Sequence, residues 1–143
     1  MIGKTYDQLQ VGEMSEFSKT ISESDVYMYA GISGDFNPAH INEAYAQNTF
    51  FKKRIAHGML TAGFISAVIG TQIPGPGTIY MSQTLNILAP VRIGDTITAR
   101  VRVSEKLDGK KRVRLETTCS NQDGEQVISG EALVSPPRPA KMQ

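Results

Sequence analysis

The stretch from Met59 to Gly70 constrains the fold of this chain more than any other. Nearly all of its residues are apolar, and the polar ones among them are small. A helix that is hydrophobic on all sides is enclosed by other structure rather than lying on a surface. The stretch therefore predicts a central, enclosed helix. A sheet could approach this helix closely, because several of its residues are small: Ala62, Gly63, Ser66, Ala67 and Gly70.

Most of the remaining chain predicts a sheet. Strand-like runs cover residues 14–21, 78–88, 95–106, 112–120 and 125–134. Two of the connections between them contain the Asp-Gly pair that is typical of hairpin turns. Between residues 96 and 103, apolar side chains alternate with polar ones, which predicts a sheet with one dry and one wet face. The fold class is therefore α+β, with a curled, mainly antiparallel sheet of about five strands wrapped around one apolar helix.

Length and composition exclude several classes of protein. With 143 residues the chain predicts one domain, residues 1–143, and the prolines after residue 135 predict a loose tail over residues 135–143. The 15 basic and 14 acidic residues nearly cancel, which argues against nucleic acid or a membrane surface as a partner. Cys119 is the sole cysteine, so an intramolecular disulfide is excluded, and no Cys/His spacing predicts a metal site. Since no signal peptide or membrane-spanning run is evident, we expect a cytoplasmic protein.

The segment from Asp35 to His40 carries the side chains best suited to chemistry. Ser22, followed by acids, predicts the start of a short helix that delivers this segment. Asn37 and Pro38 predict a bend, because proline locks its own φ and forces the residue before it to be extended. A bend lets Asp35 and His40 face one point, where they could exchange protons with a water molecule. The plainer interpretation is that Asp35 is a cap, the bend is an ordinary turn and His40 is a packing residue.

The start of the predicted central helix is a candidate anion site. Gly58 precedes the helix, so the free N–H groups of the first turn could receive an oxygen that carries negative charge. The alternative is that Gly58 is only a loop glycine ahead of a core helix. Ser66 lies about two helical turns further on, so it could line the same cleft or bond back to its own helix. For His57 we expect a structural role, as a hydrogen-bond partner of the backbone.

Three cations, Lys52 to Arg54, follow two aromatic residues ahead of this helix. The usual interpretation of such a run is a solvated loop. The cations equally suit the phosphates of a coenzyme A or the acidic face of a carrier protein. The sequence leaves both interpretations open.

Two motifs resemble a known family. Gly31–Glu43, with the pattern Asp-x-Asn-Pro-x-His, and Ala56–Leu60, with Ala-His-Gly-Met, are similar to the MaoC-like family of (R)-specific enoyl-CoA hydratases, also called hydratase 2. The resemblance extends to Gln72–Gly75 and Thr78–Tyr80 and covers nearly the whole chain. Ala39 departs from the pattern, because many members carry a larger aliphatic residue there, and this could widen the local pocket.

The resemblance implies a hotdog fold, a homodimer, and reversible syn hydration of a trans-2-enoyl-CoA to the (R)-3-hydroxyacyl-CoA in fatty-acid metabolism. Asp35 and His40 would be the catalytic pair, and Gly58 and Ser66 would bind the substrate. Asn37 would support the site. The substrate would carry coenzyme A or an acyl carrier protein, and no cofactor or metal is implied.

Three other functions remain open. A 3-hydroxyacyl-carrier-protein dehydratase would use the same residues on another carrier. A thioester hydrolase of the same fold would direct water at the carbonyl carbon, and it needs no paired acid and imidazole. A binding module would hold saturated acyl thioesters without turnover.

Overall fold

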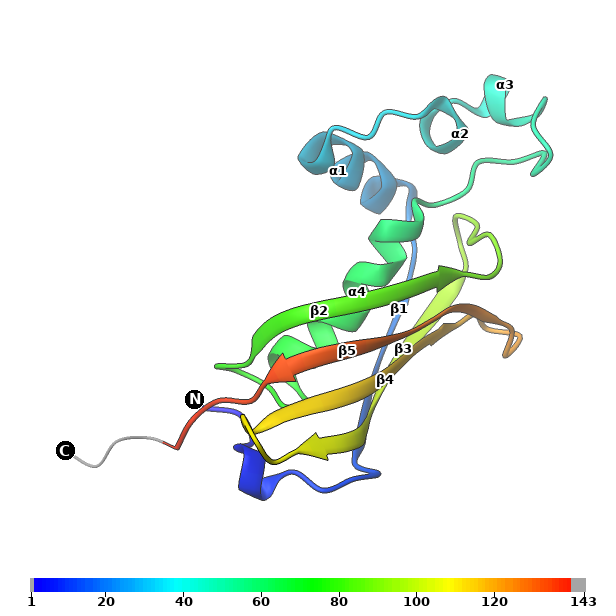
Figure 1. The fold of residues 1–143 in the computed structure, drawn as a ribbon. Helices are drawn as coiled ribbons and strands as arrows, with labels where there is room; N and C mark the ends of the chain where they lie inside the picture. Colours follow the sequence, from blue (N-terminus) through cyan, green and yellow to red (C-terminus); the bar gives the residue numbers. More distant parts are fainter. Residues whose placement is uncertain (1, 140–143) are drawn as a thin grey trace.

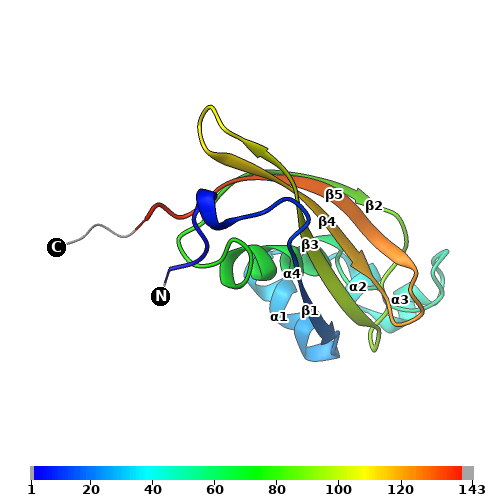
Figure 2. The same cartoon turned by 90° about the horizontal axis from the view of Figure 1, so that it is seen from below.

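Helix α4, Gly58–Thr71, lies against the inner face of a curved five-stranded sheet (Figure 1). The computed structural model describes residues 2–139. Seen from below, the sheet arches over α4 (Figure 2). The predicted α+β architecture, a sheet curled around one apolar helix, is therefore confirmed.

The strands follow the order β1-β3-β4-β5-β2, and every neighbouring pair is antiparallel. Their bounds are Met14–Thr20 for β1, Ile79–Ile87 for β2, Thr96–Leu107 for β3, Arg112–Ser120 for β4 and Gln126–Ser135 for β5. These bounds agree closely with the strands predicted from the sequence. Strands β1 and β2 form the two edges of the sheet.

Alternation along β3 places its apolar side chains in the core. Ile97, Ala99, Val101 and Val103 are fully buried and belong to the same hydrophobic cluster as Ile65 of α4. Burying one aliphatic side chain of this size stabilises a fold by about 1.5–3 kcal/mol. The shared cluster therefore fixes α4 on the sheet, and the prediction of a dry inner face is confirmed.

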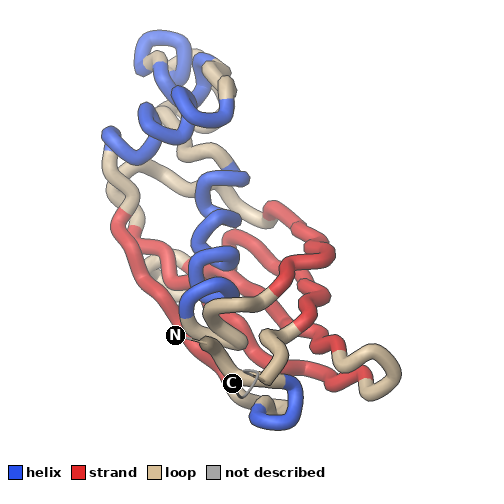
Figure 3. The backbone as a smooth tube through the Cα atoms, turned by 90° about the vertical axis from the view of Figure 1, so that its left-hand side faces the viewer, coloured by secondary structure: helices blue, strands red, loops and turns tan. Residues whose placement is uncertain are grey.

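One side of α4 is uncovered, contrary to the prediction of an enclosed helix. Met59, Gly63, Ser66 and Gly70 are exposed, and their spacing of three and four residues places them on one face. The reason is that α4 packs on β1, β3 and β4, which cover only the side turned to the sheet (Figure 3). We call Met59, Gly63, Ser66 and Gly70 the open face of α4.

Three short helices cluster beyond the N-terminal end of α4 (Figures 1 and 3). They are α1, Glu23–Ser33, α2, Pro38–Ile41, and α3, Glu43–Ala46, and a 3-10 turn, Tyr6–Gln8, lies earlier in the chain. Helix α1 begins with a reciprocal cap, in which Asp25 N donates to Ser22 Oγ at 3.1 Å and Ser22 N donates to Asp25 Oδ2 at 2.9 Å. This confirms the helix start predicted at Ser22. Among residues 2–139, no helix is long and apolar enough to cross a membrane.

The C-terminal segment is packed further along the chain than expected. Ser135 ends β5 and pairs with Ile79, and Pro136 and Pro137 are buried. The prediction of a loose tail from residue 135 is therefore wrong as far as Pro137, because Ser135 pairs within the sheet and Pro137 packs beside Gly77. Residues 140–143 of the predicted tail lie outside the described residues.

Candidate active site

A tight turn carries Asp35 away from the end of α1. Gly34 ends the helix with a positive φ of 81°, which glycine adopts without steric cost. The Asp35 N–H then donates to Ser33 Oγ at 3.1 Å, and the Asn37 N–H donates to Asp35 Oδ1, also at 3.1 Å. The turn leaves the Asp35 side chain exposed to solvent. Its carboxylate is therefore held at a defined place and remains accessible.

Asn37 and Pro38 start the next helix. The Asn37 Oδ1 accepts a hydrogen bond from the Ala39 N–H at 3.0 Å, and Pro38 occupies the first helical position, where its missing N–H costs nothing. This cap turns His40 inward, so that only 9% of it is exposed. Asn37 thus shapes the turn in the way that the sequence predicts.

His40 has a fixed orientation. Its Nδ1 lies 2.8 Å from the main-chain oxygen of Ile55, and since a carbonyl can only accept, Nδ1 carries the proton. In the neutral ring, Nε2 is then left as a proton acceptor. Ile55 contributes this contact through its backbone, so its side-chain type gave no signal in the sequence.

His57 contacts both Asp35 and His40. Its Nε2 donates to the main-chain oxygen of Asp35 at 3.0 Å. Its ring lies 3.9 Å from the ring of His40, centroid to centroid and tilted by 31°, and 4.7 Å from the ring of Tyr29. The structural role expected for His57 is therefore supported by a backbone hydrogen bond and by packing against two neighbouring rings.

Burial keeps His57 neutral. Only 2% of the residue is exposed, and this desolvation lowers the pKa of its imidazole below the ordinary value. The nearby His40 ring lowers the pKa further, whereas the Asp35 carbonyl opposes the shift. Within residues 2–139, the Nδ1 of His57 has no hydrogen-bond partner. A neutral His57 places no positive charge beside His40.

Asp35, His40 and His57 are residue types that can bind metals. One ligand atom from each lies within 4.8 Å of the others. Each histidine, however, commits one ring nitrogen to a carbonyl oxygen. The nitrogen left over on His57, Nδ1, is buried, and His57 does not line the cavity. The arrangement therefore fits proton transfer better than a shared metal ion.

The start of α4 opens into a cavity of about 280 Å³. His40 and Gly58 both line it. His57 precedes the helix, but its side chain does not cap the first turn, because it is bonded to Asp35 instead. The first N–H groups of α4 are thus available to a ligand. The other walls of the cavity are Phe51, Ile55, Ala56, Thr61, residues 87–91 and Ile128.

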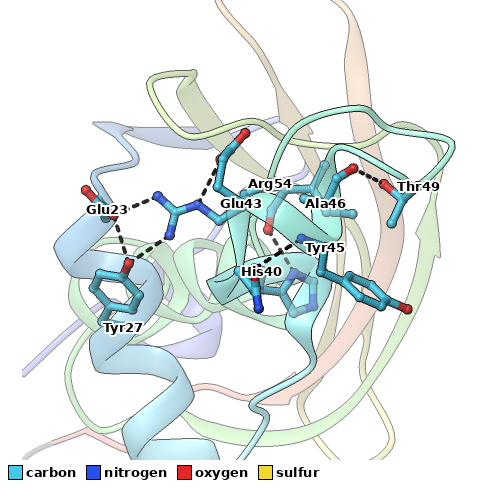
Figure 4. A network of polar contacts seen from close by, with 10 residues as sticks. Glu23, Tyr27, His40, Glu43, Tyr45, Ala46, Thr49 and Arg54 are labelled. Atoms are coloured by element: carbon cyan, nitrogen blue, oxygen red, sulfur yellow. Dashed lines mark hydrogen bonds and ion pairs between the residues drawn. The ribbon is translucent and has the colours of Figure 1, made fainter.

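The structure does not bring every predicted residue to this cavity. Ser66 lies on the open face of α4 and does not line the cavity, because a spacing of eight residues moves it around the helix. Arg54 is also elsewhere, since Nη2 bonds Glu23 at 2.7 Å, Nη1 bonds the Tyr27 hydroxyl at 2.9 Å, and Nε bonds Glu43 at 3.3 Å (Figure 4). Arg54 therefore ties α1 to α3, while the neighbouring lysines are exposed.

Comparison with known proteins identifies the family. Residues 8–125 match the sequence profile of the MaoC like domain. The chain belongs to the MaoC-like family. The resemblance found in the sequence is thereby confirmed, and so is the hotdog fold.

Relatives of this MaoC-like chain include proteins named as hydratases. An (R)-specific enoyl-CoA hydratase from Rhodospirillum rubrum is 57% identical over 92% of this chain and 91% of its own length. A 3-hydroxybutyryl-CoA dehydratase from Methylorubrum extorquens is 52% identical over 93% of this chain and 84% of its own. The unliganded R-hydratase of Pseudomonas aeruginosa superimposes with a TM-score of 0.90 at 45% identity, covering 99% of this chain and 94% of that one.

Several features of this MaoC-like site could not be predicted from the sequence. The carbonyl of Ile55 orients His40, and Tyr29 packs on His57 from α1. In the cavity wall, residues 88–91 belong to the connection between β2 and β3, and Ile87 ends β2. A backbone acceptor and a loop wall depend on the tertiary arrangement, so no residue type marks them in advance.

Proposed function

We propose that this protein is an (R)-specific enoyl-CoA hydratase, a hydro-lyase that adds water reversibly to trans-2-enoyl-CoA. One observation carries the proposal. The Asp35 carboxylate and a ring nitrogen of His40 lie within 4.8 Å of each other, and His40 shares a cavity with the open N-terminus of α4. The names of the relatives in the MaoC-like family support the same activity.

The reaction begins with a water held between two acceptors. One O–H of the water donates to the Asp35 carboxylate and the other to Nε2 of His40, which directs the oxygen lone pair outward at the substrate. The water oxygen bonds to C3 of the enoyl thioester as the C2–C3 double bond shifts its electrons toward the carbonyl. One of the two acceptors takes a water proton during this step.

The negative charge that develops on the thioester oxygen needs a hydrogen-bond donor to stabilise it. The Gly58 N–H at the start of α4 is our candidate, and removing such a donor costs about 2.7–4 kcal/mol in comparable oxyanion sites. Collapse of the enolate then moves an electron pair to C2, which receives the proton from the Asp35 and His40 pair. Because water and proton come from the same place, both add to one face of the double bond. Asn37 supports this geometry by holding the turn.

The proposed chemistry needs no cofactor. The thioester itself makes C3 electrophilic, and the protein supplies positioning, proton transfer and a hydrogen-bond donor. Coenzyme A enters as part of the substrate. The cytoplasmic location remains a prediction from sequence.

A homodimer is part of the proposal. Strand β2 is an edge strand that exposes Ile79, Met81 and Ile87, and Leu88 follows it. The open face of α4 adds further uncovered surface on the molecule. An exposed apolar edge strand favours pairing with another chain. A second copy would cover these surfaces and, with them, Ser66.

The test of the proposed activity follows the enoyl-thioester absorbance of crotonyl-CoA, with chiral analysis of the product and a thiol assay. We expect loss of the double bond, formation of the (R)-alcohol and no thiol release. Asp35→Asn and His40→Gln should each lower kcat by about a hundredfold or more. Thiol release with an intact double bond would instead identify a thioester hydrolase. Activity confined to crotonyl-carrier protein would identify the carrier-protein dehydratase, and binding without turnover would identify a binding module.

A further inference from the structure

The loop between α3 and the start of α4 forms one edge of the active-site cavity. Phe51 lines the cavity, and its main-chain oxygen accepts a hydrogen bond from Arg92 Nη1 at 2.9 Å. Ile55 also forms an isolated antiparallel β-bridge with Arg92. The loop is thus fixed at the cavity, and Phe50 and Lys52 directly flank Phe51, the residue that lines it.

Phe50 is the most exposed of the large hydrophobic residues described. Its side chain is 91% exposed and meets Phe51 edge-on, with ring centroids 5.7 Å apart. Leaving a phenylalanine in water forgoes about 1.5–3 kcal/mol of burial. A flat ring with free faces beside a cavity is well suited to stack on a planar ligand group.

Two exposed lysines follow Phe50 and Phe51. Lys52 and Lys53 are exposed, and within residues 2–139 neither forms a salt bridge, whereas Arg54 is bound to Glu23 and Glu43. The run of three cations therefore divides into one structural arginine and two lysines that are available to a ligand. Lysine ammonium groups are suited to phosphate as mobile point charges.

We propose that Phe50, Lys52 and Lys53 bind the nucleotide end of coenzyme A. The Phe50 ring stacks on the adenine, and the two lysines meet the phosphates of the same group. This inference rests on the proposed function, because it assumes that the acyl thioester occupies the cavity beside His40 and Gly58. A free aromatic face next to two charges fits a nucleotide better than the broad acidic surface of a carrier protein.

The test compares crotonyl-CoA with crotonyl-pantetheine, which has the same thioester but no nucleotide. Lys52→Ala/Lys53→Ala should raise KM for crotonyl-CoA about tenfold, leave kcat unchanged, and leave both constants unchanged for crotonyl-pantetheine. Phe50→Leu should also raise KM for crotonyl-CoA alone, and Phe50→Tyr, which keeps the ring, should restore it.

The chain offers a matched control. Lys110 and Lys111 are a second exposed lysine pair, in the β3–β4 turn, and Lys111 has a positive φ of 54° as Lys52 has one of 65°. Lys110→Ala/Lys111→Ala should therefore change neither substrate's constants. Equal effects on both substrates, or no effect on either, would overturn the proposal, and so would an effect limited to a carrier-protein substrate.

A binding measurement separates this inference from the proposed activity. Adenosine 3′,5′-bisphosphate carries the nucleotide without any acyl group, so calorimetric titration needs no turnover. Wild-type protein should bind it about tenfold more tightly than Lys52→Ala/Lys53→Ala or Phe50→Leu, and the difference should shrink at high salt. Equal binding by all variants would refute the nucleotide site even if the hydratase activity is present.

Discussion

His57 donates a hydrogen bond from Nε2 to the main-chain oxygen of Asp35 at 3.0 Å. The same ring packs on His40, with centroids 3.9 Å apart. One buried imidazole thus sets the position of both members of the proposed catalytic pair, although it lines no part of the cavity itself. His57 is therefore a positioning residue for the proposed hydration.

Two substitutions of His57 should separate the contribution of its hydrogen bond to kcat from the contribution of its ring packing. Phenylalanine keeps the ring but cannot donate, whereas the side-chain amide of glutamine can still reach toward the Asp35 carbonyl. We expect His57→Phe to lower kcat about a hundredfold, as a misplacement of about 1 Å does, with little change in KM. His57→Gln should recover most of kcat in steady-state hydration of crotonyl-CoA. The reverse order, with kcat retained by His57→Phe and lost by His57→Gln, would mean that only packing matters and would contradict the role of the hydrogen bond.

The burial of His57 predicts a pH dependence of stability. Its pKa is lowered in the folded state, so the unfolded chain binds a proton more readily. The stabilisation is complete above the ordinary pKa of 6.5 and is lost as the pH falls through the lowered value. Urea unfolding between pH 5 and pH 7.5 should show a steeper acid loss for wild type than for His57→Gln. Asp35 and His40 are present in both proteins, so identical curves would contradict the assignment to His57.

A side chain at Gly58 should narrow the active-site cavity and lower activity. A Cβ at this position would lie 3.3 Å from the Ile87 Cδ1 at the cavity wall. Because Ile87 is a flexible side chain, Gly58→Ala should leave the melting temperature nearly unchanged while it narrows the cavity. We expect kcat/KM for crotonyl-CoA to fall about tenfold, the usual effect of one misplaced methyl group. Adding Ile87→Val removes Cδ1 and should restore part of the loss, whereas no restoration would point to the helix start itself.

The open face of α4 makes the proposed dimer testable. A Cβ at Gly63 would meet nothing within 4 Å in the single chain. Gly63→Leu should therefore fold normally, but in a dimer it would clash if a second copy covers this face. Sedimentation equilibrium should show a dimer for wild type and a shift toward monomer for Gly63→Leu. Gly109→Leu, at another glycine with open space around it, is the control and should remain dimeric.

Local patterns predicted the parts of this structure that local physics determines. The strands follow from alternation, the start of α1 from the cap at Ser22, and the turn from Asn37 and Pro38. The proximity of Asp35 and His40 follows from the same turn, because the hydrogen bonds of Ser33 with Asp35, Asp35 with Asn37 and Asn37 with Ala39 join residues close in sequence.

The features that the sequence could not predict depend on tertiary contacts. They include which face of a helix the sheet covers and which distant residues a side chain meets. The all-apolar α4 was expected to be enclosed, but the sheet covers one side only, and Ser66 lies on the other. Arg54 and the two lysines before it look alike in sequence, yet among the described residues only Arg54 has acidic partners within reach, on α1 and α3. The role of His57 depends on a carbonyl 22 residues away.

The most direct test of the mechanism is the stereochemistry of hydration in D₂O. If one water between Asp35 and His40 supplies both the oxygen and the proton, deuterium enters C2 on the same face as the hydroxyl at C3. Proton NMR of the 3-hydroxybutyryl product should then show a single syn diastereomer, with the coupling constant between the C2 and C3 protons that this configuration requires. An anti product, or deuterium divided between the two faces of C2, would contradict the proposal that the pair acts from one side.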